Sequence, residues 1–221
     1  MELKTKPLLQ NKWMSLALLA TAFSLIYNPL TKFPYTFCVI ILFILIITYI
    51  RDGNLEALKF RKLGFRELKI IIIAYLALEL SVDFLIQPLV NWLCNEPADY
   101  SSFEHIKGDA PQYFKWLYRM WISAAIGEEL LFRAFAFAQL KRVFGDRKLI
   151  IVLLSAIMFC LPHFYQGTAG LIMTFIFGIA FALLYMKFQN IWINIMVHGL
   201  IDTVFLTLSF IGYLEFYQFV W

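Results

Sequence analysis

Long apolar runs constrain the fold of this chain more than any other feature. Hydrophobic residue types make up 62% of the 221 residues and charged types only 15%, which is unusual for a soluble domain. Backbone polar groups in lipid must find partners within their own segment, so such runs predict transmembrane helices. We therefore predict an all-α, polytopic transmembrane helix bundle around a polar intramembrane cavity, formed as one integral membrane domain over residues 1–221.

The predicted spans cover about residues 13–27, 35–50, 70–92, 113–140, 149–161, 169–188 and 191–213. Basic residues precede the first run, as in a signal peptide, but no small-x-small cleavage site closes it, so we expect a retained span. Splitting the last run would give an eighth span, which stays an alternative. The motifs described below lie in a C-terminal half, about 113–213, which we predict to be catalytic.

Basic residues are distributed unevenly among the connections between these runs. If the N-terminus lies inside, the inner segments hold Lys4, Lys6, Lys12, the basic residues of 51–69, Lys141, Arg142, Arg147, Lys148 and Lys187. The outer segments hold only Lys32, Lys107 and Lys115, with Arg119 close to the outer end of the fourth span. This asymmetry predicts a multi-pass protein with a cytoplasmic N-terminus. The net charge of +4 thus reflects membrane topology, and we do not expect nucleic-acid binding.

The fourth span carries charged residues that an apolar segment would not hold without a reason. An ionised side chain at bilayer depth costs at least ~2.5 kcal/mol. Glu129 and Arg133 are four residues apart, so they share a helical face and can form an ion pair. Glu128 is rotated by about 100° from Glu129 and has no such partner. We predict that Glu128 works as a base and that Glu129 and Arg133 support it.

Later spans carry polar residues that could face Glu128. Phe159 and His163 are one turn apart near the end of the fifth run. His198 and Asp202 are also four residues apart, and Asn194 extends the same face by one turn. Polar residues gathered on one face of an apolar helix are typical of a cavity lining.

Glu79 and Asp83 are a further acidic pair on one face of the third span. We expect them to have a structural role, through contact with Arg133 or Arg119 on another helix. The alternative is that they line the substrate cavity.

The three motifs Glu-Glu-x-x-x-Arg, Phe-x-x-x-His and His-x-x-x-Asp follow one another between residues 127 and 202. In this order the chain resembles the CAAX protease and bacteriocin-processing family of intramembrane endopeptidases, also called the abortive-infection family, which includes the type II CAAX prenyl endopeptidases. The resemblance implies that Glu128 and His163 activate a water molecule, and that His198 and residue 202 stabilise the oxyanion. It also implies a membrane-associated peptide or lipidated protein as substrate.

Residue 202 is Asp, whereas the pattern of the prenyl endopeptidases that the chain resembles has Asn at this position. An ionised Asp has no hydrogen to donate to an oxyanion. Either Asp202 is protonated, or it orients His198, or Asn194 supplies the donor. This departure leaves open whether the substrate is of the CAAX type or of a bacteriocin or signal-peptide type.

A metal-dependent site remains an alternative to a metal-free one. Glu128, His163 and His198 would form a His₂Glu set like that of catalytic zinc. We favour the metal-free mechanism, because the short ligand spacings typical of zinc sites do not occur.

The alternative function is a non-catalytic membrane protein, such as a bacteriocin self-immunity factor or a component of a proton-coupled transporter. The chain lacks the internal repeat that many transporters show.

Overall fold

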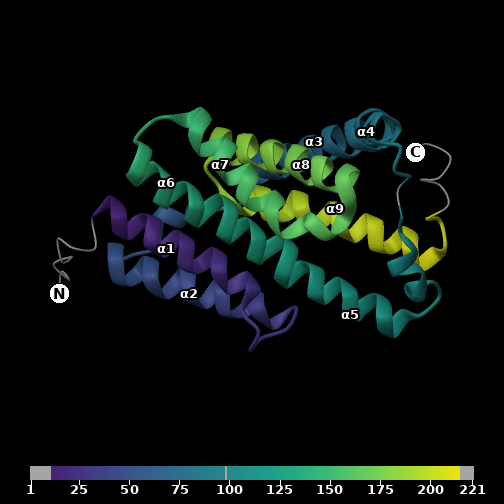
Figure 1. Ribbon diagram of the computed structural model, residues 1–221, viewed down its shortest axis with the longest axis horizontal. Helices are drawn as coiled ribbons and strands as arrows, with labels where there is room; N and C mark the ends of the chain where they lie inside the picture. Colours follow the sequence, from purple (N-terminus) through teal and green to yellow (C-terminus); the bar gives the residue numbers. More distant parts are fainter. Residues whose placement is uncertain (1–10, 98, 215–221) are drawn as a thin grey trace.

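The computed structural model describes residues 11–97 and 99–214, in which every regular element is a helix (Figure 1). This confirms the predicted all-α class. A helix covers each of the predicted runs. The number of membrane crossings stays a prediction.

The N-terminal helices α1 (Lys12–Ser24) and α2 (Tyr35–Asp52) lie side by side (Figure 1). A short 3-10 turn, η2 (Leu25–Tyr27), follows α1. Near the end of α2, buried Arg51 donates hydrogen bonds to Gln139 Oε1 at 2.6 Å and to Ser15 Oγ at 2.9 Å. The guanidinium of Arg51 thus fastens both N-terminal helices to the central helix described below.

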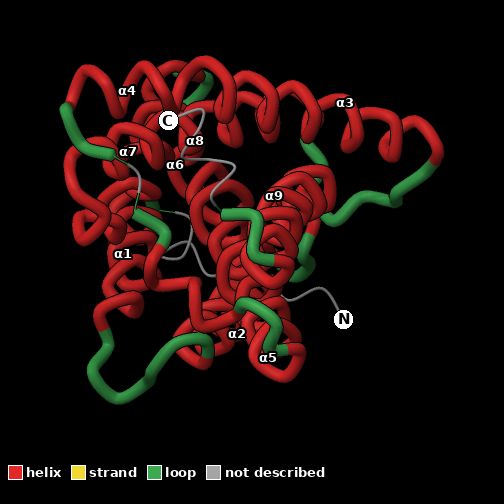
Figure 2. The backbone as a smooth tube through the Cα atoms, turned by 90° about the vertical axis from the view of Figure 1, so that its right-hand side faces the viewer, coloured by secondary structure: helices red, strands yellow, loops and turns green. Residues whose placement is uncertain are grey.

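The helices α3 (Phe65–Ser81) and α4 (Gln87–Cys94) are joined through the π-helical turn η4 (Val82–Ile86). Figure 2 shows them running along one side of the molecule, away from α2. A short 3-10 turn, η3 (Glu56–Leu58), precedes them, and another, η5 (Ser101–Ile106), follows them.

The longest helical run crosses the whole molecule. It consists of α5 (Ala110–Met120), the π-helical stretch η6 (Trp121–Phe135) and α6 (Ala136–Phe144) (Figure 1). Glycine allows two neighbours to approach it closely. A Cβ on Gly127 would lie 2.5 Å from the Phe37 ring of α2, and a Cβ on Gly199 would lie 2.6 Å from the Trp121 ring of η6.

The C-terminal half adds α7 (Lys148–Cys160), the 3-10 turn η7 (Leu161–Gln166), α8 (Gly167–Phe188) and α9 (Ile191–Ile211). The helices α7 and α8 form an antiparallel pair, since Cys160 Sγ contacts the Leu171 carbonyl and Gly178 packs on Ala156. The side chain of Asn190 caps α9 by accepting a hydrogen bond from the Trp192 N–H at 3.2 Å.

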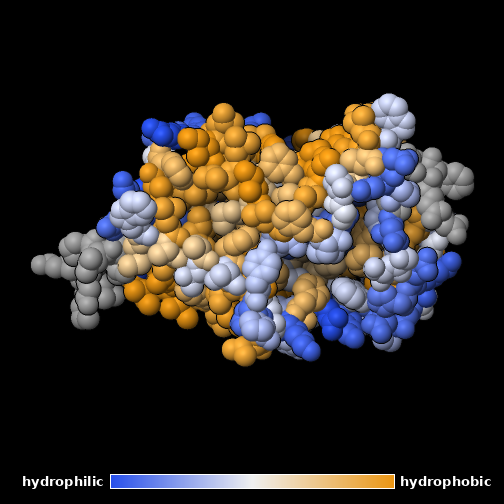
Figure 3. Space-filling model, viewed as in Figure 1, coloured by the Kyte–Doolittle hydropathy of each residue, from blue (hydrophilic) through white to orange (hydrophobic). Residues whose placement is uncertain are grey.

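The outer surface of the bundle is largely apolar between its two ends (Figure 3). Ile73, Leu85 and Leu93 are each about two-thirds exposed, a poor arrangement in water but a favourable one in lipid. By length and composition, four helical stretches of the described chain could cross a membrane: Tyr35–Asp52, Phe65–Cys94, Lys148–Phe188 and Ile191–Ile211. The last but one contains the α7–α8 pair. These features support an integral membrane protein.

Candidate active site

Glu129 is the centre of a buried polar cluster on η6. Its Oε1 lies 3.1 Å from Arg133 Nη1 and 2.9 Å from His198 Nδ1. Its Oε2 accepts a hydrogen bond from Asn194 Nδ2 at 3.1 Å. The side chains of Glu129 and Arg133 are fully buried. The ion pair predicted between them is therefore present, and it also holds two residues of α9.

Aromatic rings enclose the guanidinium of Arg133. The guanidinium carbon lies 4.1 Å from the centroid of the Phe159 ring and 5.2 Å from that of Phe181. These distances are within the range of cation–π attraction, which is strongest for desolvated groups. Arg133 Nη2 also lies 3.4 Å from the Gly178 carbonyl oxygen. Glu129 and two rings thus stabilise a cation that would otherwise be buried without compensation.

His198 is held in place by Glu129 and by the Phe181 ring. Its Nδ1 contacts Glu129, and its ring stacks on Phe181 with the centroids 4.9 Å apart and an angle of 21° between the planes. Its Nε2 lies 3.9 Å from Asp202 Oδ2, which is too long for a hydrogen bond. Because an ionised carboxylate only accepts, Nδ1 carries a proton. Nε2 is therefore the nitrogen that is free for chemistry.

Asn194 is committed to structural hydrogen bonds. Its Nδ2 donates to Glu129 Oε2 and to the Phe181 carbonyl at 2.9 Å. An amide has only two N–H groups, so both are used. This makes Asn194 a poor candidate for the oxyanion donor that the sequence left open. Asp202 Oδ2 is buried and has no hydrogen-bond partner among the described residues.

His163 lies on η7, at the start of the reversal between α7 and α8. Its Nδ1 is 2.9 Å from the Phe159 carbonyl oxygen, so Nδ1 is the protonated nitrogen. The Phe159 ring has its centroid 5.3 Å from that of His163 and 6.3 Å from that of His198. Phe159 therefore places both predicted histidines around one aromatic ring.

Glu128 differs from its neighbour Glu129 as the helical geometry requires. It is only partly buried, and it forms no hydrogen bond or ion pair with the residues that the structure describes. It is close enough to His198 and Asp202 to interact electrostatically with both. A carboxylate without a fixed partner beside these groups is available to bind water or a substrate.

The acidic pair on the third span does not make the predicted contact through Glu79. Within the described chain Glu79 forms no ion pair with Arg133 or Arg119, and it interacts electrostatically with Asp202 instead. Arg133 is already neutralised by Glu129. That part of the structural expectation is wrong, because the nearer carboxylate on the same helix satisfies the arginine.

Sequence reasoning missed the partners that enclose the cluster. Phe181 was not singled out, because one more phenylalanine in an apolar helix carries no signal. The bond from Trp121 Nε1 to Thr203 Oγ1, 3.1 Å long, also joins η6 to α9 without a motif. No group of three or more His, Cys, Asp or Glu side chains suited to a metal ion occurs in the described residues.

A comparison with protein-family models matches residues 110–204 to the family described as "Type II CAAX prenyl endopeptidase Rce1-like". The matched range contains η6, η7, α8 and the site residues of α9. It also includes the whole segment on which the sequence resemblance rests. No curated protein and no solved structure gives a significant match.

Proposed function

We propose that this chain is an intramembrane endopeptidase. The proposal starts from the Rce1-like match over residues 110–204, which confirms the family resemblance of the three motifs. Its substrate would be a membrane-associated peptide or lipidated protein, processed at a peptide bond. The observation that carries the proposal is the buried contact between Glu129 and His198, which connects two of these motifs across helices. Glu128, one position before that contact, has no hydrogen-bond or ion-pair partner within residues 11–97 and 99–214.

In the proposed reaction Glu128 accepts a proton from a water molecule that His163 helps to position. The water oxygen attacks the carbonyl carbon of the substrate, and the carbonyl oxygen becomes an oxyanion. Collapse of this intermediate breaks the C–N bond, and Glu128 returns the proton to the leaving amine. General base catalysis of this kind contributes about 10²–10⁴-fold to a rate.

His198 would stabilise the oxyanion through Nε2. A hydrogen on Nε2, in addition to the one on Nδ1, makes the ring an imidazolium, which Glu129 stabilises through its contact with Nδ1. In this proposal Glu129 and Arg133 are positioning residues, since Glu129 contacts His198 and Arg133 contacts Glu129, and neither touches the substrate. Protonated Asp202 would be a second donor, and ionised Asp202 would instead favour the imidazolium.

The experiment uses the purified full chain in lipid nanodiscs with peptides anchored in the same bilayer. Candidate peptides are a prenylated CAAX end and an unprenylated peptide with a hydrophobic anchor. Mass spectrometry in ¹⁸O-water identifies the cleaved bond and detects one ¹⁸O atom in the new carboxyl end. The proposal is supported if the parent cleaves a peptide and the His163→Gln variant does not. His105→Gln is the matched control, because His105 is an exposed histidine outside the site.

The same reaction tests the cofactor. Our prediction is the metal-free mechanism, so cleavage should be unchanged after treatment with a chelator and removal of the metal. Loss of cleavage on chelation, with recovery on adding Zn²⁺, would support the His₂Glu set of Glu128, His163 and His198 instead. If the parent cleaves none of the membrane-presented peptides, the non-catalytic alternative gains support.

A further inference from the structure

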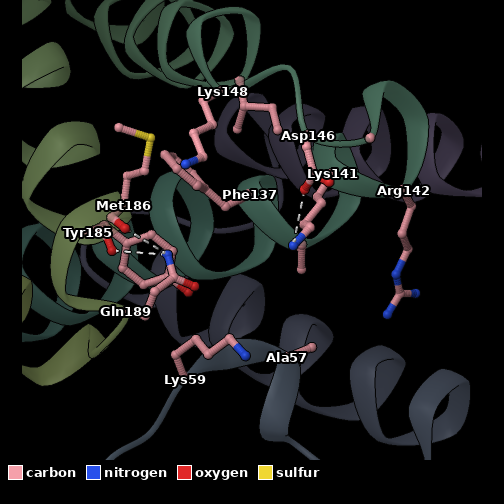
Figure 4. Close-up of a pocket in the computed structure, with 13 residues that line it drawn as sticks. Ala57, Lys59, Phe137, Lys141, Arg142, Asp146, Lys148, Tyr185, Met186 and Gln189 are labelled. Atoms are coloured by element: carbon pink, nitrogen blue, oxygen red, sulfur yellow. Dashed lines mark hydrogen bonds and ion pairs between the residues drawn. The ribbon is translucent and has the colours of Figure 1, made fainter.

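We propose that a pocket at the end of the bundle where α6, α7 and α8 meet η3 binds the phosphate group of an anionic phospholipid. The pocket has a volume of about 490 Å³, and none of the residues that line it belongs to the cluster around Glu129 (Figure 4). The proposal does not depend on the catalytic one, because the residues that carry it are not those of the proposed reaction.

Cations dominate the polar lining of this pocket. Lys59 comes from the segment after η3, Lys141 and Arg142 from α6, and Lys148 from α7, whereas Asp146 is the acid of the lining. In Figure 4, Lys59 lies across the pocket from Lys141 and Lys148. Basic side chains that converge from separate elements surround a phosphate better than an exposed basic face does.

Part of this positive charge has no counter-ion among the residues that the structure describes. Arg142 forms an ion pair with Asp52 at 2.7 Å, and Lys141 lies 3.5 Å from Asp146. The second pair is largely exposed and therefore weak. Lys59 and Lys148 form no ion pair within the described ranges. A ligand with negative charge would supply what these two lysines lack.

The apolar part of the pocket favours a lipid over a small free anion. Phe137, Ile151 and Tyr185 are buried, and the Phe137 and Tyr185 rings contact each other with their centroids 5.1 Å apart. Met186 adds a flexible apolar surface beside them. Cations that border an apolar wall match a phospholipid, whose phosphate is attached to glycerol and acyl chains.

Two backbone features hold the site open to an anion. The helix α7 begins at Lys148, which lines the pocket, and no side chain caps this helix, so the partial positive charge of its N-terminus lies beside the pocket. The backbone of Lys59 is held in place, because its carbonyl oxygen accepts the Ile191 N–H at 3.1 Å. The backbone position from which Lys59 reaches the pocket is therefore set by the fold.

The pocket also lies at an end of the bundle, beside its apolar band. In Figure 3 the polar surface near the α6–α7 turn borders the apolar band of the bundle. This end carries the basic residues that predict the cytoplasmic side, where anionic lipids attract such clusters.

The test measures binding of phosphatidylglycerol to the full chain by native mass spectrometry and by thermal unfolding in detergent. Phosphatidylcholine and inorganic phosphate are the comparison ligands. The pocket variant is Lys59→Gln with Lys148→Gln, and the matched control is Lys32→Gln with Lys115→Gln, which removes two exposed lysines elsewhere. Unfolding without ligand shows that each variant is folded.

We expect phosphatidylglycerol to bind the parent and the control equally, and to bind the pocket variant at least five-fold more weakly. Inorganic phosphate that binds the parent as tightly, and fails to bind the pocket variant, would identify a free phosphate as the source of the same chemistry. Equal binding by pocket variant and parent would overturn the proposal. An equal loss of phosphatidylglycerol binding in the control would also overturn it, because it would indicate general surface attraction. The same holds if neither phosphatidylglycerol nor inorganic phosphate binds the parent.

Discussion

At the scale of single residues, the two adjacent glutamates have different surroundings. Glu129 is fully buried and contacts Arg133, His198 and Asn194. Glu128 is partly buried and lies beside His198, and it forms no hydrogen bond within the described part of the chain. The sequence predicted this difference, because a helix turns neighbouring residues by about 100°. The contact of Glu129 with His198 could not be predicted, since it depends on how two helices pack.

Glu129→Gln removes the counter-charge of a buried guanidinium. Breaking a buried pair in this way costs about 3–5 kcal/mol, so we expect a clearly lower free energy of unfolding in detergent. The double variant Glu129→Gln with Arg133→Met removes both charges and should recover part of that loss. If Glu129→Gln were as stable as the parent, the ion pair would not contribute to stability as we argue.

Asp202→Asn introduces the asparagine that the resemblance to the prenyl endopeptidases implies at this position. An amide can donate to an oxyanion at any pH, whereas Asp202 must first be protonated. We expect kcat/KM for a prenylated CAAX peptide to rise about 10-fold, which is less than the ~10²–10³-fold that a fully positioned oxyanion donor contributes. Asp202→Ala is the control. Equal rates for the Asn and Ala variants would show that a donor at this position does not matter.

At the scale of helices, the site depends on how closely η6, α8 and α9 approach one another. Gly199 lets the Trp121 ring lie against α9, and Trp121 donates to Thr203 on that helix. The positions of these helices were predicted from apolar runs. Which helices pack against one another was not predicted, because apolar side chains in lipid carry no pattern that specifies a partner.

The start of α8 gives a prediction about pH. Glu96 Oε2 accepts the Ala169 N–H at 2.8 Å, and this hydrogen bond lowers the pKa of Glu96 below its ordinary value of 4.5. A lowered pKa in the folded state stabilises the fold above pH 4.5, and the contribution is lost as the pH falls through the folded pKa. We expect Glu96→Gln to have a lower Tm than the parent at pH 7, and to have the same Tm as the parent at a pH below the folded pKa of Glu96. The test is Tm as a function of pH, and a constant difference at all pH values would contradict it.

At the scale of the whole molecule, an apolar belt lies between two polar ends (Figure 3). Composition predicted this arrangement, because 62% hydrophobic residues leave few polar groups for a surface in water. The distribution of lysine and arginine predicts which end is cytoplasmic. The polar pocket between α6 and α8 was not predicted, because its lining comes from segments far apart in the chain.

The predicted orientation can be measured with single cysteines. After Cys38, Cys94 and Cys160 are replaced, a cysteine is placed at Lys148 or at Lys107, at opposite ends of the bundle. A membrane-impermeant thiol reagent added to intact cells should label position 107 and not position 148. Labelling of 148 alone would reverse the assigned orientation.

The central claim is that Glu128 is the base of a membrane-embedded peptidase. It is tested most directly by the rate at which Glu128→Gln cleaves a membrane-anchored peptide in nanodiscs. Glu104→Gln, which alters an exposed carboxylate on η5, is the control. We predict at least a 100-fold lower rate for Glu128→Gln, with Tm unchanged and with parent-like cleavage by the control. Cleavage by Glu128→Gln at the parent rate would contradict the claim.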